Sequence, residues 1–128
     1  MTDIHQKNGE RLLAESEHYY IVSRYEEVYL YSKADGSVIA RVGDHYGDPE
    51  SALIDRGERF CVSVGCGYIV YYIREPFLPY EYGKETAQWS EAGRGPDDIL
   101  WIESVRQTGC DEIGLTFEDG HTETVSVE

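Results

Sequence analysis

Apolar and polar residues alternate with a period of two along most of this chain, and this alternation limits the fold more than any other feature. In residues 113–117, IGLTF, large apolar side chains alternate with glycine and threonine, and Asp119-Gly120 separates them from a second alternating run. Alternation places apolar residues on one face of a β-strand, and Asp-Gly suits a hairpin turn because glycine accepts a positive φ. Asn8-Gly9 and Asp35-Gly36 predict two more hairpin turns of this kind, so the sequence predicts a meander of antiparallel strands.

The remaining alternating or apolar runs give the number of strands. We expect strands at residues 10–15, 18–23, 26–32, 37–43, 51–55, 59–65, 68–74, 99–107 and 113–117, and around Val125 and Val127. In the run 59–65, Phe60, Val62 and Val64 should share one face, whereas the run 68–74 is apolar on both faces and should lie centrally. The best helical candidate is KETAQWSEA at 84–92, which is long enough for a turn or two.

These patterns predict the fold class. The 128 residues suit a single domain, covering 1–128. We expect an all-β domain of about nine or ten strands in a mostly antiparallel meander, either barrel-like or split into two packed sheets, with little helix. The even spacing of the strands is similar to that of one or two propeller blades, although the chain is too short to close a propeller.

The net charge of −14 restricts the class of partner. Nucleic acids and anionic membrane surfaces attract basic proteins, so we expect neither as a partner. Residues 81–128 carry 12 acidic and 3 basic side chains, against 13 and 8 in residues 1–80. The excess is either a solubilising surface or a negative face that attracts a basic protein.

The chain shows no sign of export or of a structural metal. No window approaches the roughly 18 apolar residues of a membrane span, and the N-terminus lacks the pattern of a signal peptide. The three cysteines, Cys61, Cys66 and Cys110, are an odd number, and their spacing differs from that of structural zinc sites. We therefore expect a cytoplasmic protein without cofactor, and we assign these cysteines no role.

The stretch HYGDPESALIDRGE, residues 45–58, together with the preceding Asp44, concentrates carboxylates around a histidine. One interpretation is a cation site with Asp44, His45, Asp48 and Glu50 as ligands. The other is a turn, a short strand at 51–55 and a second turn that holds the remaining carboxylates. No nucleophile elbow or phosphate-binding loop accompanies the stretch, so we name no catalytic residues.

The segment 75–98, EPFLPYEYGKETAQWSEAGRGPDD, interrupts the alternation with three prolines, four large aromatic residues and six acidic residues. Long loops in compact domains are often functional, and tyrosine and tryptophan are effective interface anchors. The aromatic residues either cover the end of the sheet or form an acidic recognition surface. The candidate partner-binding residues are Tyr80, Glu81, Tyr82, Glu85, Trp89, Glu91, Asp97 and Asp98.

Residues 24–77 are similar to a group of small acidic bacterial proteins. The resemblance lies in YEEVYL, YGDP, ALIDRGE and CVSVGCGYIVY, and it continues into WIESVRQTG at 101–109. Proteins of this kind resemble immunity proteins of interbacterial toxin systems. The resemblance therefore implies a module that binds and neutralises a basic toxin, such as a nuclease, and it implies no catalytic residues.

Two other functions stay open at this point. One is a small metal-dependent or hydrolytic enzyme centred on residues 44–58. The other is a structural or regulatory β-domain without a dominant site. The patterns leave the oligomeric state open.

Overall fold

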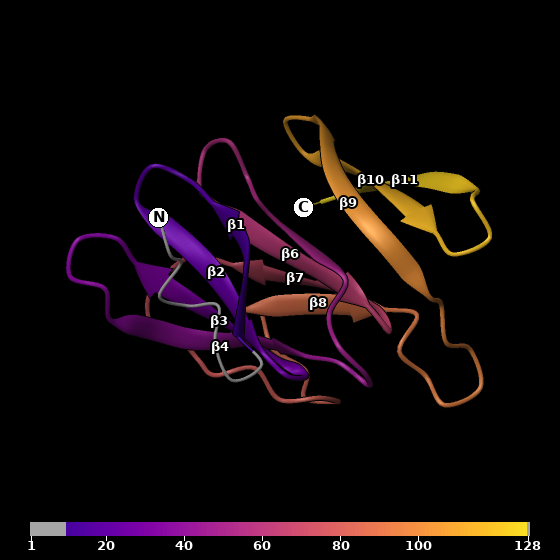
Figure 1. The fold of residues 1–128 in the computed structure, drawn as a ribbon, viewed down its shortest axis with the longest axis horizontal. Coiled ribbons are helices and arrows are strands. Elements are labelled where there is room, and N and C mark those ends of the chain that lie inside the picture. Colours follow the sequence, from indigo (N-terminus) through magenta and orange to yellow (C-terminus); the bar gives the residue numbers. More distant parts are fainter. Residues whose placement is uncertain (1–9, 128) are drawn as a thin grey trace.

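The computed structural model describes residues 10–127, which form eleven strands in three antiparallel sheets (Figure 1). Sheet 1 contains β1 (Glu10–Glu15), β2 (Tyr19–Arg24), β3 (Glu27–Ser32) and β4 (Val38–Asp44). Sheet 2 contains β5 (Ser51–Ile54), β6 (Phe60–Gly65), β7 (Gly67–Tyr72) and β8 (Trp89–Ala92). Sheet 3 contains β9 (Ile102–Gly109), β10 (Glu112–Phe117) and β11 (Thr122–Ser126). Within each sheet, every strand pairs with the next one along the chain.

The all-β antiparallel prediction is confirmed, and the strands form packed sheets rather than a closed barrel. Three sheets are present instead of two, because the connections 45–50 and 93–101 carry the chain from one sheet to the next. The turns at Asp35-Gly36 and Asp119-Gly120 have the expected geometry, with φ of 72° at Gly36 and 94° at Gly120. The turn predicted at Asn8-Gly9 lies outside the described residues.

The helix suggested for 84–92 is wrong, since residues 89–92 form β8 and residues 10–127 contain no α-helix. Trp89 is buried against Tyr71, with ring centroids 6.2 Å apart. Pairing with β7 buries the indole ring, and this gain exceeds the weak helix preference of so short a segment. Accordingly, no helix in the described part of the chain is long and apolar enough to cross a membrane.

Sheet 2 lies between the other two sheets and contributes to two hydrophobic cores. Cys61, Ile69 and Tyr71 face sheet 1 and pack in a cluster with Ile21 and Leu30. The other face of sheet 2 packs on sheet 3 and includes Phe60, Val62, Val64 and Val70. The predicted shared face of Phe60, Val62 and Val64 is therefore confirmed, and β7 is covered on both sides as expected. Burial raises the pKa of the Cys61 thiol to about 12.

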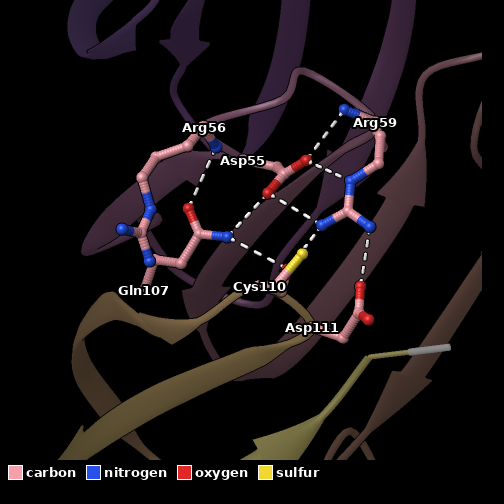
Figure 2. A network of polar contacts seen from close by, with 6 residues as sticks. All are labelled: Asp55, Arg56, Arg59, Gln107, Cys110 and Asp111. Atoms are coloured by element: carbon pink, nitrogen blue, oxygen red, sulfur yellow. Dashed lines mark hydrogen bonds and ion pairs between the residues drawn. The ribbon is translucent and has the colours of Figure 1, made fainter.

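The turn between β5 and β6 joins sheet 2 to sheet 3 (Figure 2). Asp55 is 1% exposed and accepts hydrogen bonds from Arg59 Nε at 2.7 Å and from Gln107 Nε2 at 2.6 Å. Arg59 also donates to Asp111 Oδ1 at 2.7 Å and to the Cys110 carbonyl oxygen. Because Gln107 belongs to β9 and the other two residues to the β9–β10 turn, this network fixes the third sheet on the second.

The same turn also joins sheet 2 to sheet 1. Glu58 accepts hydrogen bonds from Ser16 Oγ at 2.5 Å and from the His18 backbone amide at 2.9 Å. His18 Nδ1 lies 2.7 Å from the second carboxylate oxygen of Glu58. Asp55 thus connects sheet 2 to sheet 3, and Glu58 connects it to sheet 1, so both carboxylates have a structural role.

The contacts lower the pKa of both carboxyl groups. Burial alone would raise the pKa of Asp55, but hydrogen bonds from Arg59 and Gln107 outweigh burial and lower it to about 2. Ser16 and then His18 lower the pKa of Glu58 to about 2 as well. A carboxyl group with a lowered pKa stabilises the folded state above its unfolded pKa, and this stabilisation is lost as the pH falls through the folded value.

We predict that replacing Asp55 with asparagine lowers the free energy of unfolding by about 1–2 kcal/mol near neutral pH, because it leaves the Arg59 guanidinium without its buried anion. The unmodified protein should lose stability as the pH falls from about 4 to about 2. The D55N variant should lose less over that interval. Urea unfolding at several pH values measures both effects.

The exposed Asp97→Asn change is the matched control, and it should leave the stability near neutral pH unchanged. Equal pH profiles for the D55N variant and the unmodified protein would contradict the structural role of Asp55.

Candidate functional site

Five connections meet at one end of the molecule: β2–β3, β4–β5, β6–β7, β8–β9 and β10–β11 (Figure 1). Backbone hydrogen bonds join them. The amide of His45 donates to the Glu26 carbonyl at 2.9 Å, that of Gly67 to Leu100 at 2.7 Å, and that of Glu118 to Trp101 at 3.0 Å. We call this the acidic end, because its five connections contain seven exposed carboxylates, one arginine and no lysine. The carboxylates belong to Glu26, Asp48, Glu50, Asp97, Asp98, Glu118 and Asp119.

A hollow of about 440 Å³ opens at the acidic end. It is lined by Glu26, Asp44, His45, Tyr46, Cys66, Tyr82, Arg94, Pro96 and Ile99. Tyr46 and Tyr82 are 75% and 60% exposed and form much of its apolar wall. The hollow is therefore an aromatic depression with two carboxylates at its margin.

Arg94 holds the connections around the hollow together. Its Nη1 donates to the Cys66 carbonyl at 2.6 Å, its Nη2 donates to the Asp44 carbonyl, and its Nε lies 2.8 Å from Glu91 Oε1. Tyr82 covers the guanidinium, with 5.5 Å between the ring centroid and Cζ. The N–H donors and the charge of Arg94 are therefore engaged within the protein, so few donors remain for a bound anion.

Gly67 makes this close approach possible. It has a φ of 74°, and an added Cβ would lie 2.4 Å from the Ala92 carbonyl oxygen and 2.7 Å from Arg94 Cγ. A side chain at this position would therefore push the β6–β7 turn away from the β8–β9 connection.

His45 is buried beneath the hollow and is 2% exposed. Its Nε2 lies 2.9 Å from Ser63 Oγ, and its Nδ1 lies 3.2 Å from Arg94 Nη1. Burial, and secondly the charge of Arg94, lower the pKa of His45 to about 3. The ring is consequently neutral, and Nδ1 accepts the hydrogen bond from Arg94 while Nε2–H donates to Ser63.

Asp44 has the opposite shift. Burial and then the neighbouring Glu27 raise the pKa of Asp44.

The structure does not bring the four predicted metal ligands together. His45 faces Ser63 and Arg94, whereas Asp48 and Glu50 are exposed on the β4–β5 connection. Among the described residues, no group of three or more His, Cys, Asp or Glu side chains is arranged to hold a metal ion. The stretch 45–58 is a turn, the strand β5 and a second turn, as the second interpretation predicted.

The eight predicted partner-binding residues fall into three groups. Tyr80 and Trp89 are in the core between sheets 1 and 2, and so present no surface to a partner. Glu91 is paired with Arg94 and accepts a hydrogen bond from Tyr80. The other five residues are exposed. Tyr82, Asp97 and Asp98 are at the acidic end, and Glu81 and Glu85 are elsewhere on the β7–β8 connection.

Sequence reasoning missed three residues of this site: Tyr25, Tyr46 and Arg94. Tyr25 is 65% exposed in the β2–β3 turn and has a φ of 56°. A tyrosine in a turn between two strands was the available signal for Tyr25. The role of Arg94 depends on contacts with residues 28 and 50 positions away, which no local pattern reveals.

We predict that Arg94→Lys lowers the free energy of unfolding by about 2–3 kcal/mol, since the single ammonium group of lysine cannot reach the two carbonyl oxygens and Glu91 together. Urea unfolding measures the loss. Arg56→Lys is the control, because its exposed side chain has no described partner, and it should cost at most about 0.5 kcal/mol. Equal stability for R94K and the unmodified protein would show that Arg94 does not hold the site.

We also predict that His45 stays neutral from pH 8 down to about pH 4. His18 and His121 should titrate above the usual value of 6.5, because hydrogen bonds to Glu58 and to Asp119 raise their pKa. NMR titration of the imidazole signals measures all three. A His45 signal that moves between pH 6 and 7 would contradict its burial.

Two solved structures are similar to this chain in fold. No family model matches the chain, and no curated protein matches it. The computationally designed Ika4 protein superposes with a TM-score of 0.63 at 9% identity, over 91% of this chain and 64% of Ika4. The β-propeller domain of Cps50 (Swd1) from Myceliophteria thermophila superposes with a TM-score of 0.61 at 10% identity, over 92% of this chain and 39% of that domain. This chain therefore spans less than two thirds of either structure, and its sheets are arranged as in part of a propeller.

Proposed function

We propose that this chain is an acidic protein-binding module, and more specifically a bacterial cytoplasmic immunity protein that binds and neutralises a basic toxin such as a nuclease. The observation that carries the proposal is the acidic end, where seven exposed carboxylates surround exposed tyrosines. The acidic end faces the partner, and the opposite end of the sheets does not.

The uneven charge supports a basic partner. The five connections of the acidic end carry a single arginine, and that arginine is buried and paired with Glu91. The other five connections contain Lys33, Arg56, Arg59, Arg74 and Lys84 beside eight carboxylates, so their net charge is −3, against −6 for the five connections of the acidic end. A field concentrated at one end orients an approaching basic protein and speeds its association.

The aromatic residues supply the contact area that charge alone lacks. Tyr25, Tyr46 and Tyr82 are each at least 60% exposed, and Tyr46 and Tyr82 stand beside the hollow. Tyrosine buries a large area at low entropy cost and is enriched among the residues that dominate binding energy. Carboxylates determine the rate of association here, and tyrosines slow dissociation.

The proposed mechanism of neutralisation rests on the basic surface that a nuclease must expose to bind its nucleic acid. Such an enzyme binds phosphates through lysine and arginine side chains, so its active site is a basic cleft. A rigid acidic surface that occupies the cleft excludes the nucleic acid without any chemical step. The resemblance of residues 24–77 to small acidic bacterial proteins supports this specific form of the proposal.

The test is affinity capture from a lysate of the source bacterium with three versions of the protein. The first is unmodified, and the second carries Asp97→Asn, Asp98→Asn and Glu118→Gln at the acidic end. The third loses the same charge at the opposite end through Glu17→Gln, Asp35→Asn and Glu75→Gln. We expect the unmodified and third proteins to capture one basic protein, and the second to lose it.

With the captured protein purified, the acidic-end variant should associate about tenfold more slowly at low salt, and the opposite-end variant should match the unmodified protein. The partner should also lose its toxic activity in the complex. Equal capture by all three versions, or capture of no basic protein, would refute the proposal.

A further inference from the structure

The backbone groups of β11 divide into two sets. The Phe117 amide donates to the His121 carbonyl at 2.9 Å, and the Val127 amide donates to Asp111 at 2.7 Å. In this register residues 121, 123, 125 and 127 direct their amides and carbonyls toward β10. Thr122, Thr124 and Ser126 therefore direct theirs away from the sheet.

This outer edge is open. Thr122, Thr124 and Ser126 are exposed, and no described residue forms a backbone hydrogen bond with them. The edge of β4 differs, because the Tyr80 amide donates to the Arg41 carbonyl there at 2.9 Å. Open edges are usually protected by lysine, proline, a bulge or an inward-pointing charge, and of these β11 has only the inward-facing Glu123.

A hollow of about 240 Å³ lies beside this edge. Tyr68, Val70 and Tyr72 of β7 line it with Ser90 of β8 on one side, and Val125, Ser126 and Val127 line it on the other. A strand that is added to β11 would place every second side chain over this apolar wall. Backbone donors and an apolar surface thus occur together, which is the combination that strand addition requires.

We propose that β11 accepts an extended segment of another polypeptide as the antiparallel fourth strand of sheet 3. Sheets 1 and 2 have four strands each, and every pairing in the described chain is antiparallel. The incoming strand continues this pattern and fills the hollow beside β7.

The lining also specifies the side chains of the segment. Its inward residues opposite Val125 and Val127 are apolar, because they face Tyr68, Val70 and Tyr72. Glu123 is opposite Leu115 in the β10 register and therefore faces the same inner side. Its carboxylate contacts His121, with 3.1 Å between Glu123 Oε2 and His121 Nε2. A lysine or arginine opposite Glu123 would give this carboxylate a second partner of positive charge. This charge preference rests on the proposed function, whereas the strand addition itself does not.

A second copy of this chain is a poorer occupant. Two copies would bring together chains that each carry a net charge of −14. Pairing of β11 with its own copy would also place Glu123, rather than a basic residue, against the apolar wall. We therefore assign the edge to a heterologous basic segment.

The test is an NMR titration of the full chain with the peptide acetyl-VTVTKT-amide, in which valines oppose Val127 and Val125 and the lysine opposes Glu123. At about 1 mM peptide, we expect shifts and slowed amide exchange at Thr122, Thr124 and Ser126. Tyr68 and Tyr72 ring signals should move as well. A peptide with glutamate in place of lysine should bind several-fold more weakly.

Thr124→Pro is the matched variant, because proline removes the outward amide without breaking a hydrogen bond to β10. Thr124→Ala keeps that amide. We expect binding to be lost in the first and kept in the second. The peptide acetyl-VTVPKT-amide lacks the amide donor that would face Thr124, so it should fail to bind the unmodified protein. This peptide tests the same hydrogen bond even if the T124P variant does not fold.

Absence of shifts at the β11 edge, or binding that is insensitive to both prolines, would overturn the proposal. Equal binding of the lysine and glutamate peptides would overturn the charge assignment. A concentration-dependent dimer that T124P abolishes would assign the edge to a second copy instead. None of these results depends on the acidic end, so failure here and failure of the proposed function are distinguishable.

Discussion

The turn between β5 and β6 holds the three sheets in one arrangement. Asp55 and Arg59 bind the β9–β10 region, and Glu58 binds the β1–β2 turn. Two apolar cores account for the attraction between the sheets, but apolar contacts are non-directional and permit sliding. The charged hydrogen bonds have fixed geometry, and they act from one turn on both neighbours. At the other end of the sheets, Arg94 and backbone hydrogen bonds hold the connections around the hollow.

The function proposed for the molecule depends on the separation of its two ends. In a meander, alternate connections lie at the same end of the sheet, so residues far apart in the sequence share one surface. The five connections of the acidic end have a net charge of −6, whereas the other five connections combine eight carboxylates with five basic side chains. The open edge of β11 runs between these ends, so the two proposed contacts would lie on adjoining surfaces.

Local patterns predicted most of the strands and two of the hairpin turns, because a period of two and an Asp-Gly pair each report short-range geometry. The local patterns failed at residues 84–92, where the burial of Trp89 favours a strand over the expected helix. They also included Tyr80 and Trp89 among the candidate partner-binding surface residues, although both side chains are buried in the core between sheets 1 and 2. Aromatic residues in a proline-rich segment have the same composition whether they cover a sheet or face solvent, and only the path of the chain distinguishes the two.

The sequence by itself determined the all-β antiparallel class and the strong negative charge, and it offered two turns around a short strand as one of two interpretations of 45–58. Each of these follows from residue type or spacing along the chain. The tertiary structure alone decided that Asp55 and Glu58 join sheets and that His45 is a neutral buried residue. It also placed Arg94 under an aromatic hollow and left one edge of β11 open. Those properties arise from contacts between residues tens of positions apart, and such contacts exist only after the sheets have packed.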